Sequence, residues 1–144
     1  MPEPTPSDQI NLKIAYFNIL QNIIGRMSNY VLGIKTASIT VLAALLAFSA
    51  SVNGGCFNWG LFLIPWAVFL GYHVHFLRLE HAFRSIYNES TNTLNVEISD
   101  FKIDNSKLKE YLPSILNIIS SFPLIIFHGS LLIVIVSAYF ILSK

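Results

Sequence analysis

Two long stretches without any charged residue limit what this chain can fold into. Residues 36–77 contain no Asp, Glu, Lys or Arg, and residues 111–143 contain none either. Charged residues make up 12% of the chain, against about 25% in an average soluble protein. A helix that crosses a bilayer needs about 20 predominantly apolar residues. The sequence therefore predicts a membrane protein.

The composition also argues against several other classes of protein. A net charge of +1 offers no basic surface for nucleic acid. Cys56 is the only cysteine, which excludes an internal disulfide and a cysteine metal cluster. No GxSxG, P-loop or HExxH motif occurs, and no basic n-region of a signal peptide precedes the first apolar residues. We expect no catalysis, no cofactor, no metal and no recognisable small-molecule ligand.

The chain divides by composition into five predicted segments. These are a disordered tail (1–8), an amphipathic helix (9–35), a transmembrane hairpin (36–77), a cytoplasmic segment (78–120) and a third transmembrane helix (121–143). In the cytoplasmic segment, Leu94 to Ile103 alternate apolar and polar residues, which indicates one or two short strands or an extended stretch. The predicted fold is an all-α membrane protein whose second hairpin helix extends into the cytoplasm. The last apolar run either spans the membrane or is re-entrant.

The amphipathic helix has two different faces. Apolar residues recur at spacings of three and four from Ile10 to Ile34. Such a helix packs against the chain's own cytoplasmic helices, associates with a second copy, or lies on the membrane surface. Asparagines gather on another face, at Asn11, Asn18, Asn22 and Asn29.

Residues 66–88 connect the apolar and the charged parts of the chain. The second apolar run passes into a charged helix without a helix-breaking residue. His73 and His75 fall at the transition, where amphipathic rings sit at a membrane interface with their polar tips towards water. His128 lies inside the third apolar run and faces either a polar neighbour on a packed helix or a water-filled cavity.

Glu80 and Arg84 are four residues apart, and Tyr87 falls on the same helical face. Within one exposed helix such a pair contributes only about 0.2–0.5 kcal/mol. Partly buried between subunits, the same pair would fix the register of an assembly. Both interpretations are open at this stage.

The distribution of Lys and Arg predicts the orientation. The loop at 51–58 contains neither residue type, whereas Lys13, Arg26 and Lys35 precede the hairpin, and Arg78 and Arg84 follow it. By the positive-inside rule, the N-terminus of this multi-pass protein is cytoplasmic.

The stretch Phe76–Asn88, FLRLEHAFRSIYN, resembles the RipA-like octameric family of small bacterial membrane proteins. A Leu-Arg-x-Glu-x-x-aromatic-Arg-x-x-Tyr pattern carries the resemblance, at Leu77, Arg78, Glu80, Phe83, Arg84 and Tyr87. His73 stands where that pattern implies an acidic residue. The later stretch 126–131 is similar to the start of the family's final apolar segment. The resemblance implies a homo-oligomer in the bacterial inner membrane without an assigned catalytic activity.

We therefore expect a homo-oligomeric scaffold embedded in the lipid bilayer, with no catalysis of its own. Small residues in the first apolar run favour close helix contacts. Candidate interface residues are His73, Arg78, Glu80, Arg84 and Tyr87. An oligomeric pore of a defence or toxin system is the alternative, because a thin polar stripe follows the first crossing, formed by Ser38, Ser49 and Ser51 beside Thr36 and Thr40. A membrane-embedded subunit of an enzyme is a third hypothesis.

Overall fold

The computed structural model describes residues 5–51, 57–92 and 105–142. All elements in these ranges are helices: α1 (Pro6–Ser51), α2 (Trp59–Asn92), α3 (Asn105–Tyr111), α4 (Ile115–Ile119) and α5 (Phe122–Leu142). Helices α1, α2 and α5 are each long and apolar enough to cross a membrane. The predicted all-helical fold with three long apolar helices is thus confirmed for the described residues. The predicted strands at 94–103 lie outside these residues.

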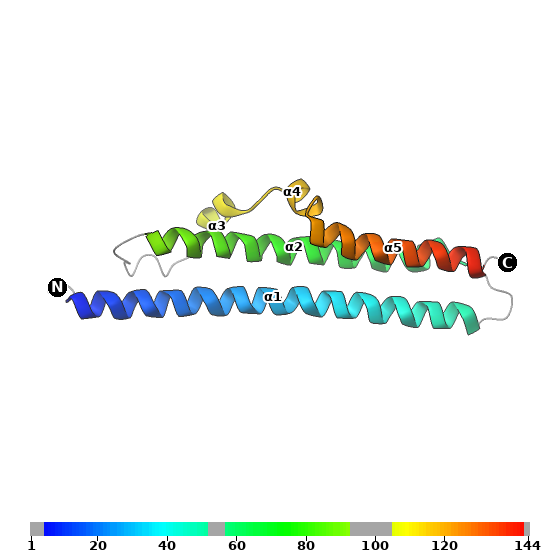
Figure 1. Cartoon of the computed structure of the whole chain (residues 1–144), viewed down its shortest axis with the longest axis horizontal. Coiled ribbons are helices and arrows are strands. Elements are labelled where there is room, and N and C mark those ends of the chain that lie inside the picture. Colours follow the sequence, from blue (N-terminus) through cyan, green and yellow to red (C-terminus); the bar gives the residue numbers. More distant parts are fainter. Residues whose placement is uncertain (1–4, 52–56, 93–104, 143–144) are drawn as a thin grey trace.

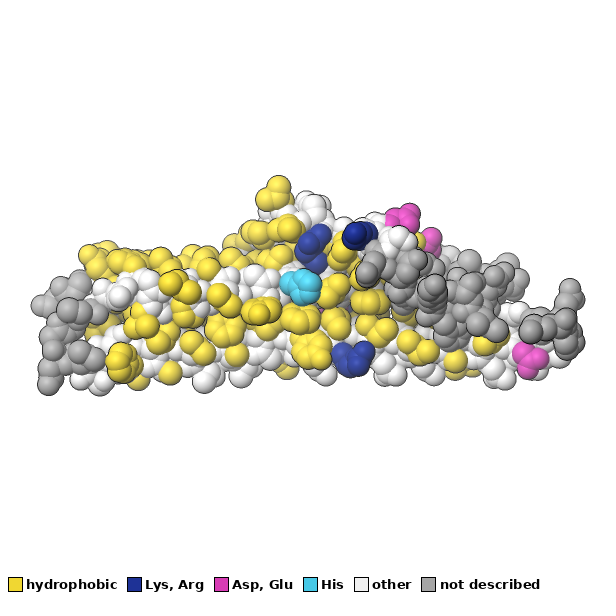
Figure 2. Space-filling view, turned by 180° about the vertical axis from the view of Figure 1, so that it is seen from behind, with side chains coloured by type: hydrophobic (Ala, Val, Ile, Leu, Met, Phe, Trp, Pro, Cys, Tyr) yellow, Lys and Arg dark blue, Asp and Glu magenta, His cyan; other side chains and the backbone are white. Residues whose placement is uncertain are grey.

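Helices α1 and α2 form a long antiparallel pair, and the remaining helices lie on α2 (Figure 1). Helix α5 starts near the middle of the pair and ends beside its closed end. Helices α3 and α4 lie over the other part of α2 (Figure 1). We call residues 36–51 of α1, 59–77 of α2 and all of α5 the apolar half, and the rest the polar half. On the face shown in Figure 2, the coloured charged side chains lie outside the apolar half.

Helix α1 continues through the point at which the sequence was divided. It runs for 46 residues, so segments 9–35 and 36–51 form one helix that starts at Pro6. Thr5 accounts for this start, because its hydroxyl accepts a hydrogen bond from the backbone N–H of Asp8. The Thr5 hydroxyl and N–H in turn bond the Asp8 carboxylate and lower its pKa.

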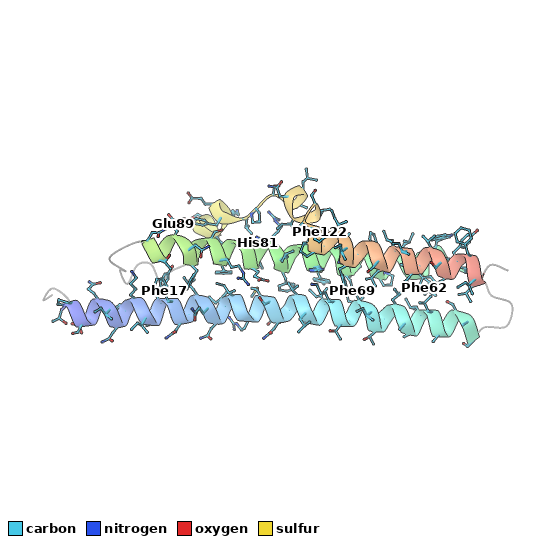
Figure 3. The ribbon with its side chains drawn as sticks, viewed as in Figure 1. Phe17, Phe62, Phe69, His81, Glu89 and Phe122 are labelled. Carbon is cyan, nitrogen blue, oxygen red and sulfur yellow. The ribbon has the colours of Figure 1, made fainter. Side chains whose placement is uncertain are left out.

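Two apolar clusters hold the helices together. In the polar half, Tyr16 and Leu20 of α1 pack on Ile86 of α2, with Phe17 beside them (Figure 3). Nearer the start of α2, Val74 packs on Ile118 of α4 and Leu124 of α5. Helix α2 is therefore the element that contacts all the others.

Aromatic rings close the end of the apolar half. Phe57 stacks on Phe62 with 4.8 Å between ring centroids. The Tyr139 ring of α5 meets the Phe57 ring edge-on, with 5.4 Å between centroids. The same ring is tilted against Trp59, with 5.0 Å between centroids. Offset and edge-on aromatic contacts add to the burial of apolar area. These rings tie the C-terminal end of α5 to the start of α2.

Shortening Leu20 tests the contact between α1 and α2. Leu20 is fully buried, so Leu20→Ala should lower the free energy of unfolding by about 2–5 kcal/mol. The measurement is thermal and denaturant unfolding in detergent, followed by circular dichroism. Ile19→Ala, at an exposed neighbouring position, is the control and should change stability much less. Equal losses in the two variants would contradict the packing of Leu20 against α2.

Candidate functional site

Two imidazoles meet in the interior of the apolar half. His73 on α2 and His128 on α5 are both buried, and His73 Nδ1 lies 3.0 Å from His128 Nε2. Either ring can donate this hydrogen bond, depending on its tautomer. His128 Nδ1 is buried and has no hydrogen-bond partner among the described residues. The pair links α5 to α2 across 55 positions of the sequence.

The prediction of interfacial histidines is wrong for His73. Its ring points into the helix packing rather than to water, because α5 covers that part of α2. His75 and His81 are exposed. The sequence predicts that His128 faces either a polar neighbour on a packed helix or a water-filled cavity. In the structure it contacts a polar neighbour, His73. Both histidines stand out in the sequence as polar residues within long apolar stretches. The sequence contains no signal that His73 and His128 contact each other.

Further groups fix the surroundings of the pair. The indole Nε1–H of Trp66 donates to the backbone carbonyl of His128 at 3.2 Å. The Lys35 ammonium of α1 lies 5.7 Å from the centroid of the Phe127 ring, a cation–π distance. All three apolar helices therefore contribute a polar group to this region.

No group of three or more His, Cys, Asp or Glu residues able to hold a metal occurs within the described ranges. Zinc sites need at least three protein ligands. Ser38, a buried hydroxyl of α1 in the apolar half, donates to the carbonyl of Ile34 at 2.6 Å. What the two imidazoles do in this arrangement is hold two helices together.

The second candidate region is the charged part of α2. The Arg84 guanidinium contacts Glu80 Oε1 through Nη2 at 2.7 Å and through Nε at 3.0 Å. The Glu80 side chain is 11% exposed and that of Arg84 is 55% exposed. The pair is thus asymmetric, because the carboxylate is enclosed while the guanidinium reaches water.

The other predicted interface residues contact different elements. Arg78 Nε donates to the carbonyl of Pro113 at 2.9 Å, which holds the segment before α4. The Tyr87 hydroxyl accepts from Gln21 Nε2 of α1 at 3.1 Å, and its ring lies 5.2 Å from that of Phe17. The structure therefore does not gather the five residues at one site.

Helices α3 and α4 are held by local contacts that sequence reasoning missed. Ser114 caps α4 by accepting a hydrogen bond from the backbone N–H of Asn117. The Tyr111 hydroxyl at the end of α3 donates to Glu89 of α2, and this bond raises the pKa of Tyr111 to about 12. The S-x-x-N spacing at Ser114 is a cap signal that the sequence does contain.

No family model, curated protein or solved structure matches this chain. The resemblance of residues 76–88 to the RipA-like family stays a prediction.

The histidine pair makes a prediction about stability. His128→Leu leaves the buried Nδ1 of His73 without its partner and should lower the free energy of unfolding by about 1–3 kcal/mol. His73→Leu should do the same. The double variant should lose less than the sum of the two, because it leaves no orphaned imidazole. Unfolding in detergent measures all three, with the exposed His75→Leu as control. Strict additivity would contradict a direct hydrogen bond between the two rings.

The unequal exposure of Glu80 and Arg84 leads to a second prediction about stability. Arg84→Ala strands an enclosed carboxylate, whereas Glu80→Ala leaves a guanidinium that water already solvates. Arg84→Ala should therefore destabilise the protein more, by about 1–3 kcal/mol. Arg84→Met, which keeps the apolar stem, separates lost packing from lost pairing in the same unfolding experiment. A larger loss of stability for Glu80→Ala than for Arg84→Ala would contradict this prediction.

Proposed function

We propose that this protein is a homo-oligomeric scaffold of the bacterial inner membrane, without catalysis of its own. Its apolar half crosses the bilayer, and its polar half projects into the cytoplasm as a stalk that assembles copies of the chain. The resemblance of residues 76–88 to the RipA-like family supports the bacterial inner membrane.

Helix lengths support the placement in a bilayer. Helix α5 has 21 residues and is about 31 Å long at about 1.5 Å per residue, close to the roughly 30 Å of a hydrocarbon core. Helix α1 has 46 residues and is about 69 Å long. About half of α1 therefore extends beyond the membrane. Lys13, Arg26 and Lys35 lie in or next to this part, which favours the cytoplasm.

The observation that carries the proposal is the surface of this projecting part. Ile10 is 60% exposed and Ile14 is 53% exposed, and the two lie one turn apart on the same side of α1. Lipid cannot cover side chains that lie beyond the membrane. Covering apolar surface is favourable by about 25 cal/mol per Å², and contiguous exposed apolar surface marks interaction sites. Additional copies of the chain supply that cover.

An oligomeric pore is a second candidate, favoured by one observation. Thr36 and Thr40 are exposed within the apolar half of α1, where a ring of copies would turn them towards a common axis. Both hydroxyls, however, donate to the carbonyls of Leu32 and Thr36 on the same helix. Their capacity to replace the hydration of a passing ion is reduced, which makes the scaffold the better proposal. An ion leak from vesicles that contain the protein would favour the pore.

The mass of the purified particle in detergent tests the scaffold. We expect one discrete oligomer across protein concentrations, and a shift to smaller particles for the double variant Ile10→Ala, Ile14→Ala. The matched control is Ile133→Ala, Ile141→Ala, which truncates equally exposed side chains in α5 that would face lipid. The control should keep the mass of the original protein. A monomer at every concentration would refute the proposal.

A further inference from the structure

The face of α1 turned away from α2 is uncovered along the whole helix. Starting at Asn11, positions separated alternately by four and three residues lie on this face, and each of them is exposed as far as residue 43. Such spacing places residues along one side of a helix. We call this surface the asparagine face, after its four asparagines, Asn11, Asn18, Asn22 and Asn29. Figure 3 shows side chains projecting from this side of α1 with no other element over them.

The chemistry of this face differs from that of an ordinary solvated helix surface. Solvent-facing sides of helices are normally rich in charge. Here no position of the repeat from Asn11 to Ala43 is charged. Lys13 and Lys35 lie towards the packed side of α1 and are partly buried, whereas Arg26 is exposed at the border of the face, four residues after Asn22. The side-chain amides of the four asparagines make no hydrogen bond to any other residue in the described ranges, although each carries donors and an acceptor.

A separate observation is the shape of the same face. A shallow hollow follows it where it enters the apolar half, lined by Asn29, Leu32, Gly33, Thr36 and Thr40. A Cβ atom added to Gly25 or Gly33 would meet nothing within 4 Å. Glycine and other small residues let a neighbouring helix approach closely. The face is therefore both unoccupied and shaped to admit a helix.

We propose that the asparagine face is the contact at which α1 of one subunit packs, in parallel and in register, against α1 of a second copy. This inference rests on the proposed membrane scaffold, because a bilayer gives every copy the same orientation. Two parallel helices in register bring each residue opposite its own counterpart. Asn22 then meets Asn22 of the partner subunit, and Asn29 meets Asn29 of the partner subunit.

Self-pairing explains the composition of the face. A charged residue opposite its own copy would be repelled, whereas an amide both donates and accepts and so complements itself. A single Asn at the core of a parallel coiled coil specifies register and number of strands. A different partner would not require an uncharged, self-complementary series. A second copy therefore fits the face better than an unrelated protein does.

The face changes character where it enters the apolar half. Thr36 donates its hydroxyl to the carbonyl of Leu32 at 3.1 Å, and Thr40 donates to Thr36 at 3.0 Å. Their methyl groups remain for packing, and Ala43 continues the face with another small side chain. The contact thus pairs amides where water is present and packs small apolar groups where it is not.

Cysteine cross-linking tests the inference. In a Cys56→Ser background, Asn22→Cys and Asn29→Cys should each give a disulfide-linked dimer on oxidation in native membranes. A disulfide requires Cα atoms within about 7 Å. Ser85→Cys is the matched control, because Ser85 is exposed on α2 and not on the asparagine face of α1. It should give no dimer. Circular dichroism of each variant checks that the helices are retained.

The outcomes separate this inference from the function on which it rests. Dimers at positions 22 and 29 without dimers at position 85 support the asparagine face. A discrete oligomer by mass that gives no dimer at 22 or 29 overturns the inference and leaves the scaffold standing. A monomer by mass refutes both. Dimers at all three positions would indicate random collision and would also overturn the inference.

Discussion

The length of the α1–α2 pair relative to the apolar half is the constraint on which the rest of this structure depends. A single uninterrupted α1 of 46 residues carries the rigidity of the apolar half directly into the polar half. Helix α5 covers only one part of α2, and α3 and α4 cover much of the rest (Figure 1). The side of α1 opposite α2 is consequently left without any cover from the described residues.

The attachment of α5 depends on a few polar contacts in apolar surroundings. The His73–His128 hydrogen bond and the bond from Trp66 to the His128 carbonyl both join α2 to α5. Apolar packing alone is not directional, so helices that meet only through Leu and Ile can slide by a turn. A hydrogen bond between two buried rings restricts that sliding, because any slip leaves polar nitrogens unpaired. The pair thus fixes where α5 lies, while Leu124 and neighbouring residues provide the contact area.

The sequence was sufficient for the long helices and insufficient for their contacts. Uncharged runs and the lack of a breaker after Tyr72 indicated α2 with its charged extension, and composition indicated α5. The change from polar to apolar sequence at Lys35 predicts a boundary between two elements, but it does not end the helix. A charge marks a change of environment, and a helix ends only where capping or backbone geometry ends it. No such signal follows Lys35, and α1 continues.

Pairwise contacts between distant residues could not be predicted in the same way. Helical spacing showed that Glu80 and Arg84 were neighbours, because four residues separate them. Nothing comparable relates His73 to His128 or Tyr87 to Gln21, which meet only because the helices fold back on one another. The apolar repeat from Ile10 to Ile34 was equally ambiguous. Leu20 and Val31 are buried, while Ile10 and Ile14 are exposed.

The two sides of α1 differ in the kind of contact to which each is suited. Tyr16 and Leu20 face α2 with large apolar side chains, which suit a contact that forms once within each folded chain. The opposite side offers mostly amides and small residues, with Leu32 and Ile39 as its large apolar side chains. A contact between two such faces buries less apolar area for each residue than the contact with α2 does. In the proposed assembly, a weak, register-specific contact would be adequate, because a bilayer that confines and orients the subunits removes much of the entropic cost of association. The difference between the two sides is therefore the one expected if folding and assembly are driven separately.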